Sequence, residues 1–331
     1  RYWELGLGGG MRFDIAYGES TLIDLLKKSV KRRLVSDVPL GVFLSGGIDS
    51  SSVVAMMAEL MNPKEIKTFS IGFDEKTYDE SSDARRVAEF FGTDHHEEIM
   101  KPKTMLDVLP SVIDILDEPF ADSSIIPTYL VSRFTRRHVT VALGGDGGDE
   151  LFLGYPSFMA HKLNGYLDAL PKSAKNKLVK ALAKLTPASN RYMSPNFKVN
   201  RFLRGLKFPP EVRHQVWIGS FIPEEERRLF MPSSGLDYRP DNIYDLTGRL
   251  FREALTADPL NRASYIYINS YMTDDILAKV DRASMANSLE VRAPFLDSEF
   301  AEFAAAIPSA LKLKGFTAKW ILKNALRQKL P

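Results

Sequence analysis

Apolar positions in the first part of the chain form two kinds of run, short continuous ones and longer ones with helical spacing. The apolar run 38–44 predicts a buried strand. After it, apolar residues recur at i, i+3, i+4, i+7 and i+8, which predicts an amphipathic helix: Val53, Met56, Met57, Leu60 and Met61. Further β-type runs at 67–73, 94–100 and 139–143 alternate with helical patterns. This alternation predicts an α/β fold, a parallel sheet with helices on both faces.

Changes in sequence texture divide the chain into four parts. Residues 1–19 are glycine-rich and are predicted to form an irregular linker. Residues 20–160 carry the alternating strand and helix patterns and form the expected core. Lysines, prolines and scattered aromatics without β alternation fill 161–260, which predicts a mostly helical insertion. Strong helical patterns return in 261–331 and are expected to complete the site.

Several helices are predicted with definite ends. One runs from 78 to 91 and ends at Gly92. Ser20 can cap another, whose inward positions are Leu22, Leu25, Leu26 and Val30. A last helix is expected over 317–328 and places three basic residues on one face, at i, i+4 and i+8: Lys319, Lys323 and Arg327. By itself this spacing favours a solvated basic stripe.

A strand, a glycine-rich turn and a helix start meet at residues 45–52, which hold four serines, two glycines and Asp49. Glycine allows a close approach of the backbone, and the free amides and dipole of a helix N-terminus attract phosphate. The alternative, a plain connection with serine caps, does not account for so many serines beside an acid. The loop is not a Walker A loop, because the chain has no G-x-x-x-x-G-K-[ST].

The fourth predicted strand runs directly into residues 144–150, which contain four glycines and three acids. A solvent turn would need fewer glycines and would not favour three acids so close together. Carboxylates suit Mg²⁺, which keeps several waters and bridges to substrate oxygens. Ser45, Gly72 and Gly144 each follow a predicted parallel strand, and ligands bind at such strand ends. We therefore expect a backbone-lined pocket for phosphate and Mg²⁺.

Composition excludes several other classes of function. Among 331 residues, 44 basic and 42 acidic side chains give a net charge of +2, which favours neither nucleic acid nor anionic membrane as a partner. No apolar run approaches the ~20 residues of a membrane span. The absence of cysteine excludes disulfides, thiolate metal sites and a cysteine nucleophile within this sequence. His95 and His96 are adjacent in a predicted strand and should point to opposite faces, as packing or surface groups. A cytoplasmic location is the expectation.

The loop S-G-G-I-D-S-S at 45–51 resembles the pyrophosphate loop of the N-type ATP pyrophosphatases, which split ATP into AMP and pyrophosphate. Together with four further strings, it makes the chain similar to the synthetase half of the glutamine-hydrolysing (class B) asparagine synthetases. These strings are T-F-S-I-G-F at 68–73, E-P-F-A-D-S-S at 118–124, G-G-D-G-G-D-E-L-F-L-G-Y at 144–155 and S-L-E-V-R-A-P-F-L-D at 288–297. The resemblance implies the adenine nucleotide α-hydrolase-like fold, with no motif placed between about 161 and 260.

The resemblance also implies a reaction and the residues that carry it. Aspartate attacks the α-phosphate of ATP to give β-aspartyl-AMP and pyrophosphate, and ammonia then forms asparagine, with ATP and Mg²⁺ required. Pyrophosphate would be held by Ser45, Gly46, Gly47, Ser50 and Ser51. Mg²⁺ would be held by Asp49 and Asp149. The adenosine and α-phosphate pocket would be lined by Leu44, Ile71, Gly144 and Gly145. The catalytic groups would be Lys319, Asp146 and Asp275.

Some features depart from the family pattern. Asp146 stands where the family commonly has glutamate. The family's N-terminal glutaminase, whose nucleophile is a cysteine, is missing, and Tyr2–Leu5 resembles the linker that follows it. We therefore expect a fragment whose full-length form carries that glutaminase domain, with a homodimer as a possibility. Two alternatives stay open: a related amidotransferase acting on a sugar acid or a β-lactam precursor, and a non-catalytic ATP-binding module.

Overall fold

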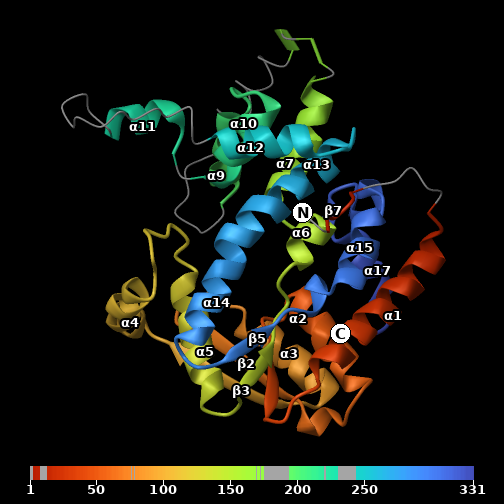
Figure 1. Ribbon diagram of the computed structural model, residues 1–331, viewed down its shortest axis with the longest axis vertical. Helices are drawn as coiled ribbons and strands as arrows, with labels where there is room; N and C mark the ends of the chain where they lie inside the picture. Colours follow the sequence, from red (N-terminus) through yellow and green to blue (C-terminus); the bar gives the residue numbers. More distant parts are fainter. Residues whose placement is uncertain are drawn as a thin grey trace.

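The computed structural model describes residues 3–7, 13–75, 77, 79–168, 170–171, 173–174, 194–219, 221–229 and 244–331. Five parallel strands form one sheet in its lower half (Figure 1). The strands are β1 (Leu40–Phe43), β2 (Lys67–Phe73), β3 (Asp94–Met100), β4 (Val141–Leu143) and β5 (Glu290–Arg292). The predicted α/β fold with a parallel sheet is confirmed. Strand β5 was not predicted as a strand.

The strand order, β3-β2-β1-β4-β5, places a change of direction beside β1. The chain moves outward from β1 through β2 to β3, then returns to the other side of β1 for β4 and β5. Residues Leu40–Val42 pair with Val141–Leu143, so β1 and β4 lie side by side and end together. The loops after these two strands therefore face one another at the switch point where α/β sheets bind ligands.

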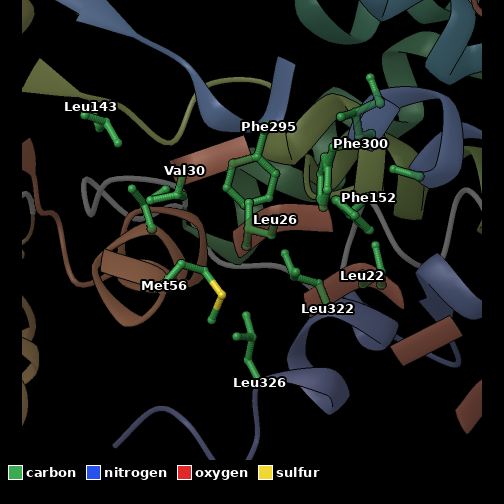
Figure 2. Close-up of a cluster of buried hydrophobic side chains, with 14 of the residues drawn as sticks. Leu22, Leu26, Val30, Met56, Leu143, Phe152, Phe295, Phe300, Leu322 and Leu326 are labelled. Atoms are coloured by element: carbon green, nitrogen blue, oxygen red, sulfur yellow. The ribbon is translucent and has the colours of Figure 1, made fainter. Parts of the chain in front are cut away.

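Helices cover both faces of the sheet, because successive side chains of each strand point to opposite sides. On one face, Val42 and Leu143 share a core with helices α1 (Ile15–Arg33), α2 (Ile48–Ala58) and α3 (Ser81–Phe91). Figure 2 shows part of this core, where Leu26 of α1 is gathered with Met56 of α2 and Leu143 of β4. The other face packs against α4 (Pro102–Asp114), α5 (Ile125–Arg136) and α14 (Ala278–Met285).

The two neighbouring histidines illustrate this division. His95 contacts Thr68 and Ser70 through its ring nitrogens, on one side of β2 and β3. His96 stacks on Phe69, on the other side. The prediction that the pair points to opposite faces, as packing or surface groups, is confirmed, and both rings take part in packing.

Above the sheet lie further helices (Figure 1). In chain order they are α6 (Gly148–Phe152), α7 (Pro156–Asp168), α9 (Pro195–Gly205), α10 (Pro210–Ile218), α11 (Pro223–Leu229), α12 (Asp245–Glu253) and α13 (Pro259–Tyr267). All regular elements in the described parts of 161–260 are helices, as the sequence predicts for this stretch. A π-helix, η4 (Ile268–Leu277), then connects α13 to α14. Within the described ranges, no helix has both the length and the apolar character to span a membrane.

The C-terminal elements differ from the predicted helix over 317–328. After α15 (Ser298–Ala306) and α16 (Ser309–Lys312), strands β6 (Leu313–Lys314) and β7 (Thr317–Ala318) form a short antiparallel hairpin. Helix α17 (Trp320–Ala325) begins only after it. Lys319 lies between them in the left-handed conformation, with φ of 55°, and its amide donates to the Phe152 carbonyl at 3.2 Å. The predicted stripe on one helix face is therefore wrong for Lys319.

The first helix also differs from its prediction. Helix α1 begins at Ile15, because the Asp14 carboxylate accepts a hydrogen bond from the Tyr17 amide at 2.9 Å and caps the helix. Ser20 lies inside the helix and donates to the Tyr17 carbonyl. The predicted cap at Ser20 is wrong, and the irregular segment ends before Ile15. Leu22, Leu26 and Val30 are buried, as expected.

Candidate active site

A cavity of about 460 Å³ opens at the carboxyl ends of β1, β2 and β4. Its lining includes the strand-end loops 44–50 and 144–150 and side chains from α5, η4 and α14. Nine of the residues predicted from the sequence line it: Leu44, Ser45, Asp49, Ser50, Ile71, Gly144, Gly145, Asp146 and Asp149. Residues nearly 100 positions apart therefore meet in one cavity.

Serine hydroxyls form hydrogen bonds within the loop that follows β1. Ser50 Oγ accepts the Ser45 amide at 3.2 Å and lies 3.2 Å from Ser45 Oγ. Gly46 has φ of 78°, and any side chain there would come within 2.5 Å of the Asp83 backbone at the start of α3. Gly47 is the N-cap of α2, whose cap makes no side-chain hydrogen bond. The loop thus leads backbone amides to the positive end of a helix, a common anion-binding arrangement.

Lys319 lies between two carboxylates at the edge of this loop. Its Nζ forms an ion pair with Asp149 Oδ1 at 2.7 Å and a second ion pair with Asp49. The side chain is buried, with the whole residue 8% exposed. Asp49 belongs to the first turn of α2 and Asp149 to the first turn of α6. Lys319 is therefore placed beside both predicted loops, although its helical position was predicted wrongly.

One ammonium between two carboxylates gives the cluster a net negative charge when all three groups are ionised. Burial determines which carboxylate ionises less readily. Burial raises the pKa of Asp49 to about 6, against the attraction of Lys319. Burial would lower the pKa of Lys319, but the two carboxylates outweigh it and raise that pKa above its ordinary value. Asp49 Oδ1 is buried and has no hydrogen-bond partner. The cluster thus keeps a charged lysine and one carboxylate oxygen that is free to accept a ligand.

Glycines of the second loop allow it to pack against the first. A side chain on Gly145 would come within 3.0 Å of the Ser50 amide nitrogen. A side chain on Gly154 would overlap both Asp149 Oδ1 and Lys319 Cε. The Gly154 amide also donates to the Asp149 carbonyl at 2.8 Å. Close packing at Gly154 therefore sets the positions of Lys319 and Asp149 together.

A second buried lysine, Lys279 of α14, lines another part of the cavity. Its Nζ donates to Asp122 Oδ2 and to Ser124 Oγ, both at 2.7 Å. Asp275 of η4 lies beside this pair. Burial, followed by the neighbouring charge of Asp122, raises the pKa of Asp275 to about 6. Asp275 is not among the cavity-lining residues, but its interactions connect it to Lys279.

Sequence reasoning did not assign Glu150 and Tyr155, although both line the cavity. Tyr155 donates a 2.6 Å hydrogen bond to Glu150 Oε1, and burial raises the pKa of Glu150 to about 7. Both residues belong to the string at 144–155, so that string was the available signal. Burial also raises the pKa of Asp146.

The remaining predicted residues contribute backbone or lie behind the lining. Gly46 and Gly47 form the turn before α2, and Ser51 is buried in its first turn at 2% exposure. Asp49 and Asp149 are the only predicted metal ligands. In the described part of the chain, no group of three or more histidine, aspartate or glutamate side chains is placed to hold a metal ion. A cation here would need oxygens from a ligand as well.

The family model described as Asparagine synthase matches residues 21–331. The chain belongs to the asparagine synthase family. It is 33% identical over 309 residues to glutamine-hydrolysing asparagine synthetase 1 of Bacillus subtilis, which covers 93% of this chain and 46% of that protein. It is 34% identical over 316 residues to a putative glutamine-hydrolysing asparagine synthetase of Mycobacterium tuberculosis H37Rv, covering 95% and 46%.

A more distant relative carries another name. The chain is 29% identical over 365 residues to the protein of Penicillium rubens named Amidase chyE, covering 98% of this chain and 52% of that protein. The chain thus spans about half the length of these asparagine synthase relatives. Its membership in the family agrees with the resemblance found in the sequence.

Proposed function

We propose that this chain is an ATP-dependent amide-forming ligase that converts aspartate, ATP and ammonia into asparagine, AMP and pyrophosphate. Membership in the asparagine synthase family supports the reaction class. The observation that carries the proposal is the position of Lys319, buried between Asp49 and Asp149 beside a phosphate-type loop at the sheet's switch point. In this arrangement, loop amides and an ammonium would converge where phosphate charge develops during the reaction.

The proposed binding mode follows the cavity lining. Ser45 to Ser51 would hold the pyrophosphate part of ATP through backbone amides and hydroxyls. Leu44, Ile71, Gly144 and Gly145 would surround adenosine and the α-phosphate. Asp49 and Asp149 would hold Mg²⁺, since this ion commonly takes one or two protein carboxylates and completes its shell with phosphate oxygens and water. The unpartnered Asp49 Oδ1 fits that role. Bound there, Mg²⁺ would offset the charge of the leaving pyrophosphate.

The reaction needs two bond exchanges. An oxygen of the acceptor carboxylate bonds to the α-phosphorus while the bond to the β-phosphate oxygen breaks and pyrophosphate leaves. Ammonia nitrogen then bonds to the acyl carbon, and AMP leaves with the transferred oxygen. Lys319 would stabilise the negative charge that develops on the α-phosphate. Asp146, whose pKa is raised by burial, would accept the proton released by the attacking ammonia. Asp275 would act through Lys279.

We further propose the four-part division of the chain given above, with a glutaminase partner in the full-length protein supplying ammonia. The absence of cysteine from this sequence supports use of free ammonia by the chain alone. A cytoplasmic location would accompany this metabolic role. A second candidate is amidation of another carboxylate, and the relative named an amidase favours keeping it open.

Pyrophosphate release tests the function directly. The chain is supplied with ATP, Mg²⁺, ammonium and one carboxylate at a time: L-aspartate, L-glutamate, a sugar acid or a carboxyethyl amino acid. Stoichiometric AMP and pyrophosphate with aspartate are expected. Release of ADP and phosphate, or no carboxylate-dependent cleavage with any acceptor, would contradict the ligase. Release only with another acceptor would support the second candidate.

A further inference from the structure

Apolar residues of α4 lie on two sides of the helix. One side, with Val108 and Val112, is buried in a cluster that includes Leu130 of α5. On another side, apolar residues recur at i, i+3, i+4 and i+7, the spacing of a helix face that packs on a partner. We call these residues the outer stripe: Leu106, Leu109, Pro110 and Ile113. All four are exposed, and the exposed fraction reaches 68% at Leu106 and 59% at Ile113.

The outer stripe is unusual for a helix at the edge of the molecule. Figure 1 draws α4 at the left edge, with α5 on its inner side. Helix α1 also lies at the periphery, but it presents Lys28 and Lys31 to solvent. Single exposed apolar residues are ordinary, whereas several that form one continuous patch are typical of an interaction surface.

Two charges flank the outer stripe. Lys103 lies in the first turn of α4 and Asp114 is its last residue. At about 100° per residue, the two side chains leave the helix within about 20° of each other around its axis. Both are exposed, and within the described ranges neither forms an ion pair. A helix dipole favours acids at the N-terminus and bases at the C-terminus, so the stability of α4 itself does not account for this placement.

We infer that the outer stripe is a self-association surface, on which α4 of a second copy of this chain packs antiparallel about a twofold axis near Leu109. Lys103 of each copy would then lie opposite Asp114 of the other, beside the negative end of that helix dipole. Leu106 would lie opposite Ile113. The midpoints of these two pairs both fall within one residue of Leu109 in the sequence, so one axis serves both.

Other arrangements and the active site are separated from this surface. A parallel pair of helices would place Lys103 beside Lys103 and Asp114 beside Asp114, where like charges repel. One pair of short helices forms a small interface, so we expect association in the micromolar range. Helix α4 contributes no residue to the described lining of the candidate active site, so self-association here is separate from the proposed function.

Sedimentation velocity at increasing micromolar concentrations tests the surface. The weight-average mass should rise from 37.2 kDa toward twice that value. Leu106→Asp should abolish the rise. Ser111→Asp, at an exposed position of the same helix outside the outer stripe, is the matched control and should associate like the wild type. Circular dichroism checks that both variants fold. A chain that stays monomeric at every concentration, or equal association of the two variants, would overturn the inference.

A charge exchange tests the antiparallel arrangement. Lys103→Glu and Asp114→Lys should each raise the Kd of self-association severalfold, because each places like charges opposite one another. The double variant should restore the wild-type Kd. Each substitution places its charge at the end of α4 that the helix dipole favours, so the fold should tolerate both. Failure of the double variant to restore association would contradict the inference.

A cross-linking measurement checks the position of the axis. The sequence has no cysteine, so a single introduced cysteine is the only one that can react. Under mild oxidation, Leu109→Cys should form a disulfide-linked dimer and Ser111→Cys should not. Equal cross-linking of the two would overturn the inference. Flotation of a monomeric chain with vesicles of phosphatidylcholine and phosphatidylglycerol, lost in Leu106→Asp, would assign the outer stripe to a lipid surface and would also overturn it.

Discussion

Lys279 and Lys319 are equally buried beside the same cavity, yet their surroundings differ. Each residue is 8% exposed, and each contacts at least one carboxylate at 2.7 Å. Lys279 sits inside a regular helix and shares its partner Asp122 with Ser124, whose amide and hydroxyl both donate to Asp122 at 2.8 Å. Every group in that pair is satisfied. The bonds from Lys279 and Ser124 overcome the effect of burial and lower the pKa of Asp122.

The ion pair of Lys319 with Asp49 lacks such a full set of hydrogen bonds, and Lys319 itself has an unusual backbone. Its backbone has φ of 55°, a conformation that non-glycine residues seldom adopt. Burial raises the pKa of Asp49 instead of lowering it, and Asp49 Oδ1 has no partner. An ion pair whose polar atoms all have hydrogen-bond partners stabilises the fold. An ion pair with an unpartnered oxygen and a strained backbone is typical of a functional site, where a ligand supplies the missing contact. We therefore propose that Lys279 serves the fold and its charge balance and that Lys319 serves the chemistry.

The largest expected effect follows from removing the proposed chemical lysine. Lys319→Ala should lower the rate of adenylate formation by about a hundredfold, since a lost transition-state contact of this kind costs on the order of 3 kcal/mol. Lys323→Ala, in the following helix, is the control and should keep its activity. Lys319→Ala also leaves Asp49 and Asp149 without their charge partner and should melt at a lower temperature, so the two activities are compared at a temperature at which both variants stay folded. Equal pyrophosphate release by the two would return Lys319 to a structural role.

The reverse pattern is expected at the other lysine. Asp122→Asn leaves the Lys279 ammonium without its charge partner and should reduce the free energy of unfolding by about 2 kcal/mol. Asp49→Asn should melt at or above the wild-type temperature, because it removes a buried carboxylate that lacks a full set of partners, while pyrophosphate release at limiting Mg²⁺ falls sharply. Thermal melts of the two variants would contradict the comparison if Asp49→Asn were the less stable.

A smaller effect should follow from crowding Lys319 without removing it. Gly154→Ala places a methyl group where Asp149 Oδ1 and Lys319 Cε now lie, so kcat should fall about tenfold with little change in the KM for ATP. Gly165→Ala is the matched control, because nothing lies within 4 Å of the added carbon there. Steady-state kinetics that show equal kcat values for both variants would contradict the role of Gly154.

The smallest effect concerns pH. Because the Asp49 pKa is raised to about 6, the folded chain holds that proton more tightly than the unfolded chain. The contribution of this proton to the free energy of unfolding is therefore complete below the pKa of Asp49 in the unfolded chain, and it is lost as pH rises through about 6. Asp122, whose pKa is lowered, contributes stability above its unfolded pKa that is lost in acid. As pH increases from 4 to 7, the melting temperature of Asp49→Asn should rise by a few degrees relative to that of the wild type. A difference in melting temperature that does not change with pH would exclude this titration of Asp49.

The sequence predicts those parts of the fold that depend on local pattern. The strands β2 and β3 have the predicted bounds, and the helix before Gly92 ends as predicted, with that glycine at φ of 70°. Strand β5 has only three residues, so its period cannot be recognised, and its place is set by pairing with β4. Asp14 replaced Ser20 as a cap because both residue types fit the same role.

The residues of the candidate site also divide into those that local pattern predicts and those that only tertiary contacts place. Residues in loops that follow predicted strands, such as Ser45 and Gly144, could be placed together from topology alone. Lys319 reaches the site through a hairpin between β6 and β7 and a hydrogen bond to Phe152, which are tertiary contacts with no local signal. The pairing of Lys279 with Asp122 joins residues 157 positions apart and likewise cannot be read from spacing.

The most direct test follows one oxygen atom through the reaction. Aspartate labelled with ¹⁸O in its β-carboxyl group is incubated with the chain, ATP, Mg²⁺ and ammonium, and the products are measured by mass spectrometry. Attack of the carboxylate on the α-phosphate predicts one ¹⁸O atom in AMP and none in pyrophosphate. Unlabelled AMP, or ¹⁸O in inorganic phosphate, would contradict the acyl-adenylate and with it the role assigned to Lys319.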